Sequence, residues 1–136
     1  MRRSTFVRAN RATNRVVCRL GVREFRGNKL LYLTTTGRKT GKQRTSPVLY
    51  LLDQDRWIVV ATNNGANWEP GWWLNLQAGA PATVDVDGVT TPVTGVEVCG
   101  PEHDRLWREL NERFDYDSYQ LCVSRRLAIV ALSPVD

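Results

Sequence analysis

The sequence predicts a mainly β fold with covering helices, in which six mainly antiparallel strands form a small closed or split barrel. Six runs rich in β-branched and aromatic residues support this, because short polar or Gly-containing turns separate most of them. Asp87-Gly88, between two of these runs, is a strong signal for a two-residue hairpin. The stretch from Leu30 to Leu52 holds two further runs around a turn with two glycines. An open α+β sheet is the alternative architecture.

The chain has the usual length of one domain, 136 residues, and we divide it into a basic N-terminal helix, residues 1–29, and a barrel, residues 30–136. Its three cysteines have no C-x-x-C spacing, which argues against a disulfide framework or a zinc site and indicates a reducing compartment. No apolar run reaches the roughly 18 residues of a membrane span, and Arg19 interrupts the N-terminal candidate for a signal peptide. We therefore expect a cytoplasmic protein.

Positive charge is concentrated at the N-terminus. Residues 1–29 contain nine Lys or Arg and one acid, Glu24, so the remainder is net negative although the whole chain carries +5. Four arginines recur at spacings of three and four, which predicts a basic amphipathic helix: Arg8, Arg11, Arg15 and Arg19. Gly27 and Asn28 predict its end. The stripe fits a solvated face of a helix packed on the barrel, or a peripheral contact with anionic lipid or RNA.

The other elements follow in chain order. The predicted strands are residues 30–36, 44–52, 57–62, 82–86, 89–98 and 127–132. Short turns join the first three, which predicts an antiparallel meander. Pro70 begins a short helix. Pro101 begins a longer one, expected to cover an open barrel end with an apolar face of Leu106, Trp107, Leu110 and Phe114.

The turn after residue 36 gathers positive charge. Gly37 and Gly41 let a ligand approach backbone N–H groups, and the neighbouring cations are Arg38, Lys39, Lys42 and Arg44. This pattern predicts an anion-binding site, and a solvated hairpin is the alternative. It is not a nucleotide-binding P-loop, because three residues separate the glycines and a strand follows instead of a helix. Hydrolysis of a nucleoside triphosphate is therefore excluded.

Three tryptophans lie within six positions beside the Gly- and Asn-rich loop 63–67: Trp68, Trp72 and Trp73. Aromatic faces stack well and bury much area, so they predict either a flat-walled pocket for a planar ring or ordinary core packing.

The chain lacks the residues of self-sufficient catalysis. It has no G-x-S-x-G motif, no metal-binding cluster and no carboxylate pair in a loop. His103 is the single histidine, and it is expected on the surface without a role. Reactivity must then come from a cofactor, while the protein supplies binding, orientation and electrostatics.

Three blocks of sequence carry a resemblance. They are LTTTGRKTGKQRTSPVLYL, then VVATNNGANWEPGWWLNLQAGAP, then YDSYQ followed by a terminal IVALSP. Together they resemble the deazaflavin-dependent nitroreductase family, split-barrel proteins of the flavin-binding type that bind the deazaflavin coenzyme F420. The resemblance spans Leu30 to Val135, and the three blocks in this order are more specific than any one of them.

The resemblance implies the site residues. Those matching positions that hold the cofactor's phosphate and acidic tail are Arg38, Lys39, Thr40 and Arg44. Those expected beside the ribityl chain and ring are Thr45, Ser46, Pro47, Val48 and Leu49. Those expected to line the deazaflavin ring are Val60, Ala61, Thr62, Asn63, Gly71, Trp72, Trp73, Leu74 and Asn75. Tyr116 and Tyr119 match tyrosines near the substrate.

The implied reaction is hydride transfer from reduced deazaflavin to an electron-poor acceptor such as a nitroaromatic, a quinone or an enone. Tyr116 or Tyr119 is expected to donate a hydrogen bond or proton to the oxygen where negative charge develops. An FMN protein of the same barrel type is one alternative, because a basic hairpin would equally hold its phosphate. A non-enzymatic cofactor carrier with a membrane- or RNA-contacting helix is the other. No specific nucleic acid is expected, and the sequence leaves the oligomeric state open.

Overall fold

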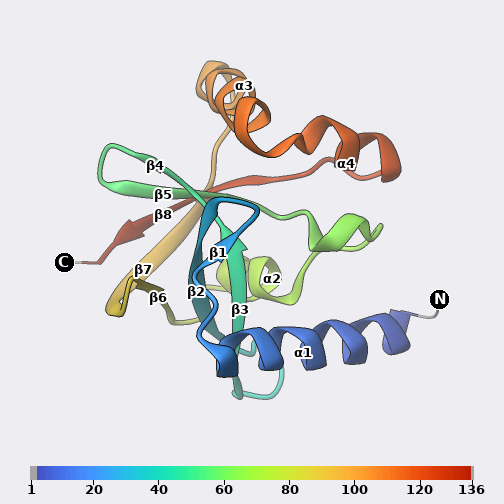
Figure 1. Cartoon of the computed structure of the whole chain (residues 1–136), viewed down its shortest axis with the longest axis vertical. Coiled ribbons are helices and arrows are strands. Elements are labelled where there is room, and N and C mark those ends of the chain that lie inside the picture. Colours follow the sequence, from blue (N-terminus) through green and yellow to red (C-terminus); the bar gives the residue numbers. More distant parts are fainter. Residues whose placement is uncertain (1–2, 136) are drawn as a thin grey trace.

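The computed structural model describes residues 3–135 as helices joined to one curled sheet (Figure 1). The helices are α1 (Arg3–Leu20), the short 3-10 helix η1 (Asn63–Gly65), α2 (Gly71–Gln77), α3 (Pro101–Phe114) and α4 (Tyr116–Cys122). The strands are β1 (Glu24–Phe25), β2 (Asn28–Thr36), β3 (Gln43–Leu49), β4 (Leu51–Asp53), β5 (Arg56–Val60), β6 (Ala82–Val86), β7 (Val89–Glu97) and β8 (Ile129–Pro134).

The strands form an antiparallel half-barrel in the order β1-β2-β6-β7-β8-β5-β4, and β3 pairs with β2 outside this path. The predicted antiparallel, barrel-like sheet with covering helices is therefore confirmed in its coarse form, as a mixed α/β structure. The predicted number of six strands is wrong, since the described residues form eight. Strand β1 was missed because its two residues are too few to show an alternating pattern, and the three residues of β4 were merged with β3 into one predicted run.

The predicted run from Arg44 to Leu52 is also corrected. It divides at Tyr50 into β3 and β4, and β5 pairs with β4 and β8. The expected three-strand meander is wrong because β3 pairs with β2 alone among the described strands. Pro47, opposite Tyr32 in β3, is tolerated there since a strand with one unpaired edge can spare an N–H donor.

The sheet separates two apolar cores. Successive β8 residues point to opposite faces, as a strand requires: Val130 and Leu132 join the inner core, and Ile129 and Ala131 the outer one. The inner core lies inside the curl and is filled from α2 by Trp73 and Leu76. The outer core is covered by α3 and α4, which lie on the opposite side of the sheet from α1 in Figure 1.

The predicted apolar face of α3 is confirmed. Leu106 and Leu110 are fully buried in the outer core, with Trp107 and Phe114 packed against it. The tyrosines expected beyond this helix lie on a further helix, α4, which begins after Asp115 in the left-handed conformation.

The N-terminal helix ends earlier than predicted. Gly21 has φ +68°, its N–H bonds the Cys18 carbonyl, and the Val22 N–H reaches back to Val17, which is a Schellman C-cap. Gly27, predicted to end this helix, instead forms the β1–β2 turn with φ +79°. The division of the chain at residue 29 stays a prediction.

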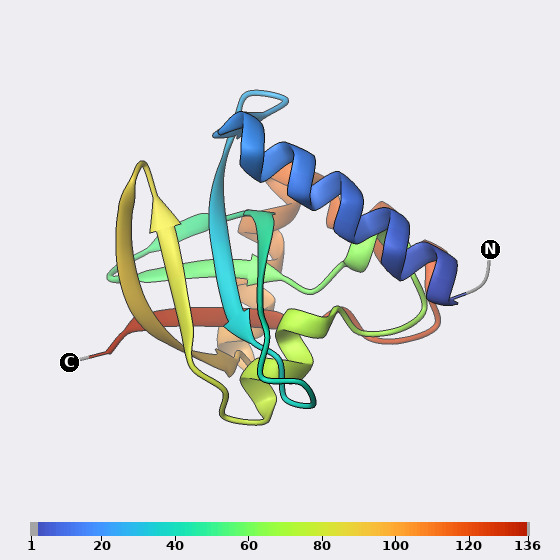
Figure 2. The same cartoon turned by 90° about the horizontal axis from the view of Figure 1, so that it is seen from below.

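Figures 1 and 2 show α1 running from the sheet near β2 and β3 outward to the N-terminal end of the chain. The side chains of Arg8 and Arg15 lie outside the described ones, and Arg11 and Arg19 of the predicted stripe are exposed. No helix among residues 3–135 combines the length and the apolar character needed to cross a membrane.

Candidate functional site

The β2–β3 ladder ends at the pair Thr36–Gln43 and leaves a tight turn, residues 37–42. The Gly37 N–H bonds the Lys42 carbonyl at 2.8 Å, and the Gly41 N–H bonds the Gly37 carbonyl at 2.9 Å. Gly41 has φ +72°, and a Cβ on Gly37 would lie 3.1 Å from the Lys42 carbonyl oxygen. Both glycines are thus required by the backbone, which lets the turn expose its cations.

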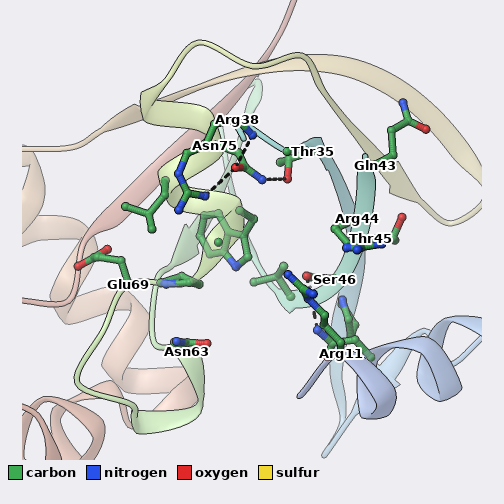
Figure 3. A pocket seen from close by; sticks show the side chains of 18 of the residues that line it. Arg11, Thr35, Arg38, Gln43, Arg44, Thr45, Ser46, Asn63, Glu69 and Asn75 are labelled. Carbon is green, nitrogen blue, oxygen red and sulfur yellow. Dashed lines mark hydrogen bonds between the residues drawn. The ribbon is translucent and has the colours of Figure 1, made fainter. Parts of the chain in front are cut away.

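The turn is anchored to α2 through a buried amide. Asn75 is 5% exposed and accepts from Arg38, and its own N–H₂ donates to the buried Thr35 hydroxyl at 2.9 Å. Figure 3 shows these three side chains side by side. Both the oxygen and the nitrogen of this buried amide are hydrogen-bonded. Moving any of its partners away would leave a buried polar group without a hydrogen bond, which costs free energy, so the amide holds these partners in place.

The loop between β5 and α2 holds an uncommon backbone. Asn63 and Asn64 have φ of +48° and +53°, a conformation that Asn tolerates better than most residues. The Asn63 side chain donates to the Trp68 carbonyl at 3.0 Å and closes the loop on itself. The Asn-rich composition, predicted as loop, is thereby explained by positive φ.

Arg125, just before β8, holds this loop from behind. Its guanidinium donates to the carbonyls of Ala61, Thr62 and Ala66 at 2.9, 3.0 and 3.1 Å, and pairs with Glu69 at 3.2 Å. Its side chain is only 12% exposed. Sequence reasoning missed Arg125, because nothing in the pattern separates it from the exposed Arg126 beside it.

The turn, the loop, α1 and α2 enclose a cavity of about 640 Å³, the central cavity. This volume lies within the usual range of small-molecule sites. Most predicted cofactor residues line it: Arg38, Lys39, Thr40, Arg44, Thr45, Ser46, Pro47, Val48, Val60, Thr62, Asn63, Gly71, Trp72, Leu74 and Asn75. Leu49, Ala61 and Trp73 do not, and the last two are buried in the inner core behind it.

Helix α1 supplies lining residues that sequence reasoning did not assign: Arg11, Asn14 and Cys18. Asn14 reaches the Ser46 hydroxyl at 3.5 Å, which places the helix against β3. Burial raises the pKa of the Cys18 thiol, so this side chain is neutral near pH 7. The spacing of the arginines in α1 was the one sequence signal from which a role of Arg11 in the site could have been predicted.

Charge is distributed unevenly around the central cavity. Five cations from the β2–β3 turn, β3 and α1 line it: Arg11, Arg38, Lys39, Lys42 and Arg44. Among the described lining residues the single acid is Glu69, which pairs with Arg125. Figure 3 shows Glu69 and Asn63 across the cavity from Arg44 and Arg11. The arrangement suits an elongated ligand with anionic groups at one end and a flat ring against Trp68 and Trp72 at the other.

The two predicted catalytic tyrosines do not line the central cavity. Tyr116 is 5% exposed and packs against Trp107, Phe114 and Tyr119. Burial raises the pKa of its hydroxyl well above the ordinary value. Tyr119 is 40% exposed and lies beside Gly65, next to the lining residue Asn64.

Comparison with known proteins gives concordant results. Residues 5–134 match the family model described as F420H(2)-dependent quinone reductase. A protein of Mycobacterium tuberculosis named F420H(2)-dependent quinone reductase is 36% identical over 107 residues, which cover 76% of this chain and 72% of that protein.

Two solved structures have a similar fold. The structure of an F420-H2 dependent reductase superposes with TM-score 0.68 at 26% identity and covers 76% of this chain and 93% of its own. A chain solved as a domain-swapped dimer superposes with TM-score 0.70 at 25% identity, covering 96% of this chain and 98% of its own.

Proposed function

This chain belongs to the F420H(2)-dependent quinone reductase family of oxidoreductases, and we propose that it binds reduced F420 in the central cavity and reduces a quinone there. The observation that carries the proposal is the polarity of the cavity, cationic at the β2–β3 turn and aromatic at the loop and α2. We assign the half-barrel to the flavin-binding split-barrel type. The residue roles that follow are part of this proposal.

The cationic end is assigned to the cofactor's phosphate and acidic tail. Arg38, Lys39, Thr40 and Arg44 are the proposed ligands, as the sequence resemblance implies, and Arg11 of α1 lines the same cavity. Charge-assisted hydrogen bonds contribute about 1.5 to 3 kcal/mol each, so four supply roughly 6 to 12 kcal/mol before ordering costs. A dissociation constant near 1 μM, about 8 kcal/mol, is consistent with that sum.

The ring is assigned to the space between β3 and the loop–α2 wall. The residues proposed beside it include Ser46 to Val48 on one side and Val60, Asn63 and Trp72 on the other. Ala61 and Trp73 support this wall from the inner core, where both are buried. They are therefore assigned an indirect part in ring binding.

The chain's own residues bind, orient and shield, and when bound the reduced deazaflavin supplies the hydride. A quinone that takes up a hydride develops negative charge on oxygen, which a nearby hydroxyl donor stabilises. We assign this role to Tyr119 in preference to Tyr116, because Tyr119 is exposed beside the loop that lines the cavity. Nitroaromatics and enones share the quinone's electron deficiency and are proposed as alternative acceptors.

We also propose that the protein is cytoplasmic and contacts a membrane peripherally through α1. Val16 and Leu20 are 57% and 73% exposed on the helix that carries the exposed Arg19. Apolar side chains beside cations favour an anionic lipid surface. Co-sedimentation with anionic vesicles, compared with neutral ones, tests this contact.

The reaction is tested by mixing the purified protein, without oxygen, with reduced F420 and a water-soluble quinone. The expected result is quinone-dependent return of the visible absorbance of oxidised deazaflavin, and no comparable turnover with reduced FMN. Oxidation no faster than in the absence of protein would contradict the proposed function. Faster turnover with FMN would favour the alternative of an FMN protein.

A further inference from the structure

Arg125 lies behind the loop that lines the central cavity and is not itself a lining residue. Each guanidinium nitrogen donates a bond, and three of its acceptors are main-chain carbonyls of the loop that follows β5. A mostly buried cation is retained only with such partners, since an unpaired buried charge is costly. Arg125 therefore imposes one conformation on the loop.

In this conformation, the direction of the Thr62 carbonyl fixes the direction of the next backbone N–H, that of Asn63. The carbonyl accepts from the Arg125 Nη2 at 3.0 Å, and no cis peptide bond occurs among the described residues. In a planar trans peptide the C=O and the following N–H point in opposite directions. The Asn63 N–H therefore points away from the Arg125 guanidinium, and Asn63 is one of the residues that line the central cavity.

That N–H has no acceptor among the described residues. Among the hydrogen bonds of the described residues, those of Asn63 run from its side chain to Trp68 and from Ala66 to its carbonyl, and none uses its backbone N–H. Donors beside a cavity normally find a partner in protein, water or ligand. The pyrimidinedione part of a deazaflavin carries carbonyl oxygens that accept such a bond.

We propose that Arg125 is a positioning residue for ring binding: it holds the loop of Ala61 to Ala66 so that the Asn63 N–H donates to a carbonyl oxygen of the deazaflavin. This inference rests on the proposed function, because it takes F420 as the ligand. Lysine cannot replace Arg125, since a single ammonium on a flexible stem cannot serve carbonyls in a fixed fork.

The test measures binding of two ligands to Arg125→Lys: complete F420, and the deazariboflavin fragment that lacks the phosphate and the acidic tail. We expect Arg125→Lys to weaken both by the same factor, about tenfold, which corresponds to one hydrogen bond. The matched control is Arg126→Lys, because Arg126 is 67% exposed and pairs with Glu97 on the surface. The control is expected to stay within about twofold of the wild type.

A second comparison distinguishes an effect on binding of the deazaflavin ring from an effect on binding of the phosphate and acidic tail. Lys39→Ala is expected to weaken complete F420 while leaving the fragment unchanged, whereas Arg125→Lys affects both. Fragment binding to Arg125→Lys within about twofold of the wild type would overturn the inference, as would a loss confined to complete F420. If wild-type protein binds neither ligand, the proposed function itself fails.

Folding of the variant is checked by circular dichroism and by thermal unfolding without ligand. Should Arg125→Lys not fold, Arg125→Gln, which keeps an amide donor for the loop carbonyls, is titrated with the same two ligands and has the same expected and contradicting results.

Discussion

Asn75 of α2 holds Arg38 of the β2–β3 turn through two hydrogen bonds to a single atom. The Asn75 Oδ1 accepts from the Arg38 backbone N–H at 3.1 Å and from its guanidinium at 3.0 Å. The two residues are 37 positions apart, so one buried amide sets the position of the cationic turn relative to the helix that carries Trp72.

Asn75→Ala is expected to lower the free energy of unfolding by about 2 to 3 kcal/mol, because the buried Thr35 hydroxyl and the Arg38 N–H lose their partner. The same change is expected to weaken F420 binding, since Arg38 is released. Urea denaturation and fluorescence titration measure the two effects. Gln77→Ala, at an exposed position of the same helix, is the control, and equal stability of the two variants would contradict this role of Asn75.

Lys39→Ala and Arg44→Ala are each expected to raise the dissociation constant for F420 about tenfold, as expected for one charge-assisted bond. The loss should shrink at high salt, because exposed charges are screened. The control is Arg108→Ala, which removes the same charge from the exposed side of α3. Unchanged affinity in both turn variants would end the assignment of the cationic end to the phosphate and tail.

The coarse fold and the cationic turn were predictable from local pattern. Asp87-Gly88, the Leu106–Leu110 face and the glycines of the turn each depend on short-range chemistry that the sequence displays. The end of α1 was not predictable from local pattern. Gly21 and Gly27 are equally good helix terminators, and only the pairing of Glu24 with Lys29 in the β1–β2 hairpin decides between them. The break at Tyr50 likewise depends on where β4 finds its partner.

The site was predictable where charge or aromatic residues cluster in sequence. The site was not predictable where it depends on contacts between residues far apart in the sequence. Arg125, for example, pairs with Glu69, more than fifty positions away. The sequence does not distinguish Arg11 from the other arginines of α1, because its position at the cavity depends on how α1 packs on β3.

Tyr119→Phe is expected to lower kcat for quinone reduction about tenfold or more, with the affinity for F420 unchanged, because the variant lacks the proposed hydroxyl donor. Tyr116→Phe removes a hydroxyl in the outer core and is expected to change kcat less. Steady-state kinetics at saturating reduced F420 distinguish the two. A larger kcat loss in Tyr116→Phe would reverse the assignment.

Asp53→Asn is expected to destabilise the protein by about 1 to 2 kcal/mol at neutral pH. Asp53 accepts from Arg105 of α3 and from Arg56 of β5, and these partners hold the pKa of its carboxyl below the ordinary 3.8. A lowered folded-state pKa gives stability that is present above the unfolded value and lost as pH falls through the folded one.

The difference in unfolding free energy between wild type and Asp53→Asn should therefore shrink below about pH 4. Urea denaturation across this range measures it. Asp55→Asn, exposed in the same turn, is the control and should stay within about 0.5 kcal/mol of the wild type. A difference that persists undiminished in acid would show that Asp53 acts through packing and not through its charge.

The central claim is that F420 lies between the cationic turn and the loop–α2 wall, and a crystal structure of this chain with F420 tests it most directly. The predicted result has the phosphate against Arg38, Lys39 and Arg44, and the ring beside Trp72 with the Asn63 N–H on one of its carbonyl oxygens. F420 bound elsewhere, with the cations of the turn directed into solvent, would contradict the account.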